Sequence, residues 1–139
     1  MSELNTFYDN LILVPTTSFV VAVILKWISE WIKTWKVNIR RALWSGGMPS
    51  VHAAVVVALA SWVALKWGIQ SDFFAMALSF TVIIIYDAIN VRFEAGLHAK
   101  AINAALGHKK FKESLGHLPS EAFAGSILWI IVAIVLYYI

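Results

Sequence analysis

Cysteine is absent from the 139 residues of this chain, and charged side chains are scarce. The absence of cysteine excludes disulfide bonds and thiol chemistry, and it leaves the redox compartment undetermined. Charged residues make up 14% of the chain and hydrophobic residues 60%, whereas an ordinary soluble domain is about a quarter charged and about half apolar. A soluble chain of this length could not bury so much apolar surface, but a bilayer can cover it. The composition therefore predicts a membrane protein.

The few charges are unevenly placed. The formal net charge is +3, and the cations fall mainly in two short segments, which suits loops at a membrane surface better than a groove for nucleic acid. Residues 1–10 lack the basic region of a signal peptide, so we expect the first apolar stretch to be retained. No linker, repeat or low-complexity stretch divides the chain, which predicts a single membrane domain over residues 1–139.

Four apolar stretches predict an all-α integral membrane bundle of about four transmembrane helices. Each stretch approaches the roughly 20 residues that an α-helix needs to cross the hydrocarbon core. Tryptophan and tyrosine gather near the ends of the stretches, as in an interfacial aromatic belt. A soluble helical bundle is disfavoured because almost no polar face remains to meet water. The predicted helices cover about residues 11–32, 51–67, 73–91 and 122–139.

The connections between these helices differ in character. Residues 68–72 form a short polar turn, whereas residues 33–50 and 92–121 carry most of the cations and three of the four histidines. With four crossings, the two long connections emerge on the same side of the membrane. Within the second of them, apolar residues recur at every fourth position from Phe93, which predicts a short amphipathic helix over about residues 93–106.

Residues 46–52, Gly-Gly-Met-Pro-Ser-Val-His, lead directly into the second apolar helix. The glycines, Gly47 among them, let the backbone approach a ligand closely. The free N–H groups at the helix start and the Ser50 hydroxyl form a cradle for phosphate oxygens. His52 could then donate a proton to a leaving oxygen. The alternative is a helix cap with a histidine at the interface, and this motif alone does not decide between the two.

Residues 115–121, Leu-Gly-His-Leu-Pro-Ser-Glu, open the last apolar helix. If Pro119 and Ser120 start the helix, Glu121 lies beneath His117. A carboxylate that accepts from one ring nitrogen fixes the tautomer and leaves the other nitrogen free to attack. Alternatively, Glu121 is an acid in the first turn that complements the helix dipole, and taken alone the motif favours this simpler interpretation.

Residues 86–92, Tyr-Asp-Ala-Ile-Asn-Val-Arg, place an acid in or at the end of a membrane helix. Asp87 would be costly there without a partner. Arg92 or Lys26 could supply the countercharge, and a structural ion pair of Asp87 is at least as good an interpretation as a catalytic role. Arg92 could equally hold phosphate in a bidentate fork. Lys26 could either bind phosphate or extend its ammonium group to the interface.

Together, the three motifs resemble those of a known family. The chain resembles the divergent branch of the type 2 phosphatidic acid phosphatase superfamily, which is related to vanadium-dependent haloperoxidases. Members of that branch carry Gly-Gly-Met-Pro-Ser-Ser-His, then Tyr-Asp-Ala-x-Gly-Val-Arg-Arg, then Leu-Gly-His-Thr-Pro-x-Glu-Val. Their counterparts here are residues 46–52, 86–93 and 115–122, in the same order and with similar spacing. The resemblance covers nearly the whole chain.

This resemblance implies a membrane-embedded phosphatase that hydrolyses a lipid phosphomonoester or pyrophosphate through a phosphohistidine, without a metal or cofactor. His117 would be the nucleophile and His52 the general acid. Glu121 would replace the aspartate that usually supports the nucleophile.

The superfamily also binds phosphate with an early lysine and two arginines. Lys26 matches a lysine that the divergent branch carries in its first helix, whereas Lys33 and Arg40 reproduce the superfamily's spacing of lysine to arginine. We favour the first assignment, and reasoning from the sequence does not separate them. The predicted phosphate-binding residues are Lys26, Gly47, Ser50, Arg92 and Lys112, and the predicted supporting residues are Asp87 and Arg40.

The chain departs from the family pattern at four positions. Val51 stands where the family has Ser or Gly, Asn90 replaces Gly, and Phe93 replaces the second Arg of its motif. Phe111 occupies the place of an arginine six residues before the nucleophile, although Lys112 beside it could compensate. Because cations are missing, a catalytically silent protein that binds anionic lipid or supports a membrane assembly is the alternative. A small transporter that conducts protons through the histidines is a third interpretation.

The expected partners are a lipid phosphate substrate and membrane lipids, with no nucleic acid, and so thin a bundle is compatible with a homodimer. Under the positive-inside rule, the cation-rich connections and the site would face the cytoplasm, in a multi-pass protein of the cell membrane with both termini outside. Superfamily lipid phosphatases commonly place this site on the outer face. The sequence favours the cytoplasmic side, because many lysines and arginines outside the predicted phosphate site also lie in these connections.

Overall fold

The computed structural model describes residues 10–35 and 49–138, and every regular element within them is helical. This confirms the predicted all-α class. The elements are α2 (Leu13–Thr34), α4 (Val51–Trp67), α5 (Asp72–Tyr86), the π-helical turn η1 (Asp87–Val91), α6 (Arg92–Leu106) and α7 (Pro119–Tyr138).

The helices have the length and apolar character of membrane spans. Three helical stretches of the described residues are long and apolar enough to cross a membrane, and α4 is a shorter apolar helix. Large apolar side chains such as Phe80 and Phe123 lie on the outer surface, more than half exposed. A bilayer covers such a surface, so the chain is an integral membrane protein. The three long stretches are Leu13–Ile32, Asp72–Leu106 and Pro119–Tyr138.

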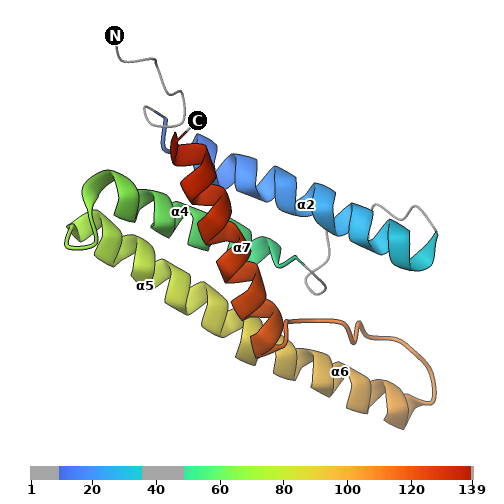
Figure 1. The fold of residues 1–139 in the computed structure, drawn as a ribbon. Helices are drawn as coiled ribbons and strands as arrows, with labels where there is room; N and C mark the ends of the chain where they lie inside the picture. Colours follow the sequence, from blue (N-terminus) through green and yellow to red (C-terminus); the bar gives the residue numbers. More distant parts are fainter. Residues whose placement is uncertain (1–9, 36–48, 139) are drawn as a thin grey trace.

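Helix α4 lies at the centre of the bundle, where it contacts α2, α5 and α7 (Figure 1). Most of its buried residues are alanine and valine, and small residues let neighbouring helices approach closely in a membrane. At its start, α4 packs against α7: a Cβ added at Gly125 would lie 3.6 Å from the Cβ of Ser50. This contact brings the beginnings of α4 and α7 together.

The third predicted helix and the amphipathic helix form one continuous helical stretch. The turn η1 joins α5 to α6 without a break, and the backbone N–H of Arg92 donates to the carbonyl of Asp87, five residues earlier. The residues of α6 that are buried are Gly96, Ala99 and Asn103, whereas the predicted apolar stripe is largely exposed. The segment 107–118 folds back over the face of α6 that carries Gly96 and Asn103, so this face is buried and the predicted stripe is not.

Figure 1 shows how the helices run relative to one another. The start of α2, the turn between α4 and α5 and the end of α7 lie towards one end of the molecule. The end of α2 and all of α6 lie towards the other end, and the starts of α4 and α7 face the same way. The helix ends that the two long connections join are therefore at the same side, as expected from four crossings.

Candidate active site

The two motif histidines meet at the starts of α4 and α7. His52 lies in the first turn of α4, and His117 stands two residues before α7. Their ring centroids are 6.3 Å apart, with the ring planes at 72°. His117 is almost fully buried, at 2% exposed, while His52 is half-buried. The structure thus places the proposed acid and the proposed nucleophile within reach of a single phosphoryl group.

The backbone of His117 is fixed by the turn η1. Its N–H donates to the carbonyl of Ala88 at 3.0 Å. The preceding residue, Gly116, has a positive φ of 75°, and a Cβ added there would lie 2.4 Å from the backbone nitrogen of Phe93. Only glycine allows the chain to pass so close to the start of α6. π-Helical turns occur often at functional sites, and here one supplies the anchor of the histidine.

Glu121, in the first turn of α7, faces the ring of His117. Its Oε2 lies 3.5 Å from the His117 Nδ1 and accepts a hydrogen bond from the Leu118 N–H at 3.0 Å. The first contact is an ion-pair distance, longer than a strong hydrogen bond. Glu121 therefore caps the helix start and faces Nδ1 at ion-pair distance. The Nε2 atom is the ring nitrogen that does not face Glu121.

Burial sets the charge state of His117. Desolvation lowers the pKa of His117, the nearby carboxylate of Glu121 opposes this shift, and the positive charge of Lys26 adds to it. A lowered pKa keeps the imidazole neutral at neutral pH, with a lone pair available. A neutral imidazole is the form that a nucleophilic role requires.

Two lysines from distant parts of the chain converge here. Lys26 of α2 is 2% exposed, its charge acts on both histidines, and the charge of Lys112 acts on Lys26. Lys112 belongs to the segment between α6 and α7, and burial lowers the pKa of its ammonium group. Two cations held near each other favour an anion between them. The structure places Lys26 with the other candidates, whereas Arg40 is outside the described residues.

Arg92 and Asp87 form an ion pair across η1. The Nε of Arg92 donates to Oδ2 of Asp87, and both side chains are partly exposed. The pair lies close enough to His52 for both charges to act on its ring. Asp87 thus has the partner that the structural interpretation requires, and Arg92 is the countercharge.

Ser50 caps α4 at the base of the site. Its Oγ accepts a hydrogen bond from the Ala53 N–H at 3.3 Å, and the residue is 1% exposed. A hydroxyl that accepts through a lone pair retains its hydrogen for donation to an anion. Gly47 and Arg40 lie outside the described residues. Among the residues that the structure describes, no cluster of three or more His, Asp or Glu could hold a metal ion.

Asn103 of α6 organises the segment that carries Lys112, and the sequence interpretation did not identify it. Its amide nitrogen donates to the Phe111 carbonyl at 2.7 Å and to Glu113 Oε1 at 2.8 Å. Its oxygen accepts from the N–H groups of Lys110 at 2.9 Å and of Phe111 at 2.8 Å. The only signal in the sequence is an asparagine on the same helix face as Gly96 and Ala99.

Comparisons with known proteins agree with the motifs. The chain matches the Divergent PAP2 family over residues 7–132. It is 39% identical to the uncharacterized membrane protein YuiD of Bacillus subtilis strain 168, in a comparison that covers 68% of this chain and 72% of that protein. No solved structure matches the chain. The family match spans all three motifs and all the described helices up to the last turns of α7, and the chain belongs to the Divergent PAP2 family.

Proposed function

We propose that this protein hydrolyses a phosphomonoester or pyrophosphate bond of a membrane lipid through a phosphohistidine intermediate. The observation that carries the proposal is the pairing of the buried, Glu121-facing His117 with His52 at a ring separation of 6.3 Å. The Nδ1 of His52 is also buried without a hydrogen-bond partner among the described residues. Such an atom in a folded protein calls for an explanation, and a bound ligand provides one.

In the first step, the Nε2 lone pair of His117 attacks phosphorus. A P–N bond forms while the P–O bond to the lipid breaks. His52, in its protonated form, gives its proton to the leaving oxygen, so the lipid departs as a neutral alcohol or as a phosphate monoester. Glu121 stabilises the positive charge that develops on the ring of His117.

In the second step, water attacks the phosphorus of the phosphohistidine. His52, now neutral, accepts a proton from that water, and the P–N bond breaks with its electron pair returning to His117. Inorganic phosphate leaves and both histidines regain their starting forms. Lys26, Lys112 and the Ser50 hydroxyl stabilise the negative oxygens of the phosphoryl group in both steps.

The alternative is a catalytically silent protein that binds anionic lipid with the same cations. Two observations favour it: Arg92 is engaged by Asp87, and Phe111 is exposed where the superfamily has an arginine. The two functions differ in turnover. Phosphate release from phosphatidate, phosphatidylglycerol phosphate and polyprenyl pyrophosphate should be measured with purified protein and with His117→Ala. Release by the native protein alone supports a phosphatase, whereas lipid binding without release by either supports the silent protein.

A further inference from the structure

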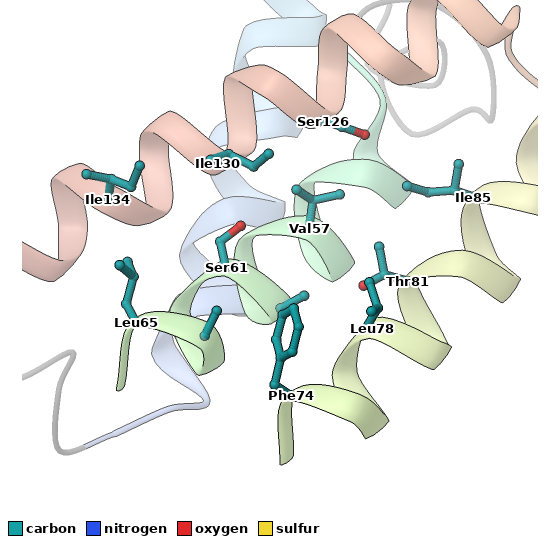
Figure 2. A pocket seen from close by; sticks show the side chains of 12 residues that line it. Val57, Ser61, Leu65, Phe74, Leu78, Thr81, Ile85, Ser126, Ile130 and Ile134 are labelled. Carbon is teal, nitrogen blue, oxygen red and sulfur yellow. The ribbon is translucent and has the colours of Figure 1, made fainter. Parts of the chain in front are cut away.

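An apolar groove of 460 Å³ lies between α4, α5 and α7 (Figure 2). This volume is within the range of small-molecule binding sites. Its lining contains no charged residue. The hydroxyl groups of Thr81 and Ser126 donate to backbone carbonyls, at Val56 and Ala122 respectively, so they present little polarity to a ligand. The groove therefore suits an apolar occupant.

The groove exists because small residues of α4 form its floor. Ala60 is buried, and Ser61 and Ala64 are half-buried. The rims are formed by larger, exposed side chains of the flanking helices, such as Leu78 of α5 and Ile130 of α7. Figure 2 shows the Ser61 side chain between these rims. The floor is thus shielded by protein, while the open side faces the surrounding lipid.

The groove begins near the candidate active site. On α7 it starts at Ser126, which follows the Gly125 contact with Ser50. On α5 it ends at Ile85, two residues before Asp87. On α4 its first residue is Val57, about 8 Å along the helix axis from His52 at 1.5 Å per residue. A phosphate held at His52 would lie about 8 Å from the start of the groove. The part of a lipid that joins its phosphate to its hydrocarbon chain can span this distance.

We infer that this groove binds a hydrocarbon chain of the lipid phosphate whose head reaches His117. The inference rests on the proposed function, because it assumes that a lipid phosphate occupies the site. The groove adds to that function a subsite that selects lipids by the length of their hydrocarbon chain. It also positions the phosphate of the bound lipid near the histidines.

The length of the groove favours a hydrocarbon chain over a helix from a second copy of this protein. Its lining runs from Val57 to Leu65 on α4, which is about 12 Å at 1.5 Å per residue, and from Phe74 to Ile85 on α5, which is about 17 Å. A partner helix that spans the membrane would need a stripe matching much more of the roughly 30 Å hydrocarbon core. A chain that starts at the head group and ends inside one leaflet needs no more than this length.

Ser61→Phe tests the inference, because it places a ring on the groove floor without touching the site. Ser61→Ala is the matched control, since it removes the hydroxyl and leaves the space. Ala64→Leu is a second, milder filling variant, and Ala75→Phe adds similar bulk to the exposed face of α5 outside the groove. For Ser61→Phe we expect kcat/KM for long-chain phosphatidate to fall about tenfold or more. The rates with short-chain phosphatidate and with nitrophenyl phosphate should be unchanged.

A second measurement does not depend on turnover. Phosphatidate with a photoreactive group at the chain end should label peptides that contain Leu65 or Phe74 in Ser61→Ala. Ser61→Phe and Ala64→Leu should reduce that labelling, while Ala75→Phe should not.

The outcomes separate this inference from the proposed function. Groove labelling without phosphate release from any substrate supports the groove and contradicts the phosphatase. Phosphate release whose chain-length preference is the same in Ser61→Phe, Ala64→Leu and Ser61→Ala overturns the groove. A change of oligomeric mass in Ser61→Phe with unchanged chain-length preference also overturns it, because a second copy would then fill the space.

Discussion

The charge state of His117 links its burial to the proposed chemistry. Burial lowers its pKa, Glu121 raises it and Lys26 lowers it. The nucleophile must be neutral, so the acid limb of the pH profile of kcat/KM should have an apparent pKa below the ordinary pKa of imidazole. The opposing effects of the two neighbours can be separated by substitution.

Lys26→Met and Glu121→Gln should move the pKa of His117 in opposite directions. Lys26→Met removes a positive charge that disfavours the imidazolium, so the pKa of His117 and the acid limb should rise. Glu121→Gln removes a negative charge that favours the imidazolium, so both should fall. An NMR titration of labelled histidine measures the pKa even where activity is lost. Shifts in the same direction would contradict the arrangement of charges around His117.

At the scale of the elements, the position of His117 depends on how closely the preceding loop crosses α6. Gly116→Ala should strongly destabilise the protein, because the added Cβ overlaps the backbone of Phe93 and φ is positive. Gly107→Ala is the control, since φ is also positive there but no atom lies within 4 Å of the added Cβ. The control should cost only the left-handed strain, about 1–2 kcal/mol. Thermal unfolding in detergent compares the two, and equal losses would show that the close crossing is unimportant.

The hydrogen bonds from Asn103 to residues 110–113 predict a second effect on stability at this scale. Asn103→Ala removes four part-buried hydrogen bonds, which should cost about 2–3 kcal/mol. The amides of Lys110 and Phe111 should lose protection from hydrogen exchange. The protection of backbone amides in α4, which Asn103 does not contact through a hydrogen bond, serves as the internal control. Unchanged protection at both amides would mean that other contacts hold the loop.

The sequence predicted the helices better than the parts that join them. Helix 51–67 was predicted with the bounds that α4 has, because an apolar run between polar residues is a local signal. The turn η1 has no such local signal in the sequence, since its Ala88 carbonyl accepts from the distant His117 N–H. The exposed apolar stripe of α6 was misleading for the same reason, because the buried face is chosen by the folded-back segment. Pro119 starts the last helix three residues earlier than its apolar run suggested.

The candidate site was partly predictable from the sequence because both histidine motifs begin helices. Helix starts on one side of a four-crossing bundle must be near each other, and the structure places His52 and His117 in contact distance. The position of Lys26 near the histidines required the structure, since a lysine inside an apolar helix has no sequence signature that distinguishes it from a snorkelling one. The position of Glu121 also required distances, because the same carboxylate accepts from the Leu118 N–H and lies 3.5 Å from the His117 Nδ1.

For the whole molecule, the long stretch α5–η1–α6 sets the position of the membrane. Residues 72–91 are about 30 Å long at 1.5 Å per residue, which matches the hydrocarbon core of about 30 Å. We therefore expect α6 to lie beyond the core on the side of the candidate site. The lysines of α6 and of the segment after it lie on that side as well.

We propose that this side is cytoplasmic. Single cysteines at Gln70 and Lys110 report the two sides of this cysteine-free chain, and both positions are exposed. An impermeant thiol reagent applied to intact cells should label Gln70→Cys and spare Lys110→Cys. Labelling of both after permeabilisation is the control for reactivity. The reverse pattern in intact cells would place the site outside.

The central claim is that phosphate passes through His117. The most direct measurement is the trapping of protein-bound phosphate after rapid quenching with a labelled lipid phosphate. We expect acid-labile, base-stable label on His117 in the native protein, none in His117→Ala, and formation slowed by about 10²–10⁴-fold in His52→Ala with an alkyl leaving group. The same acid-labile label on a well-folded His117→Ala protein, or lipid turnover by it, would contradict the account.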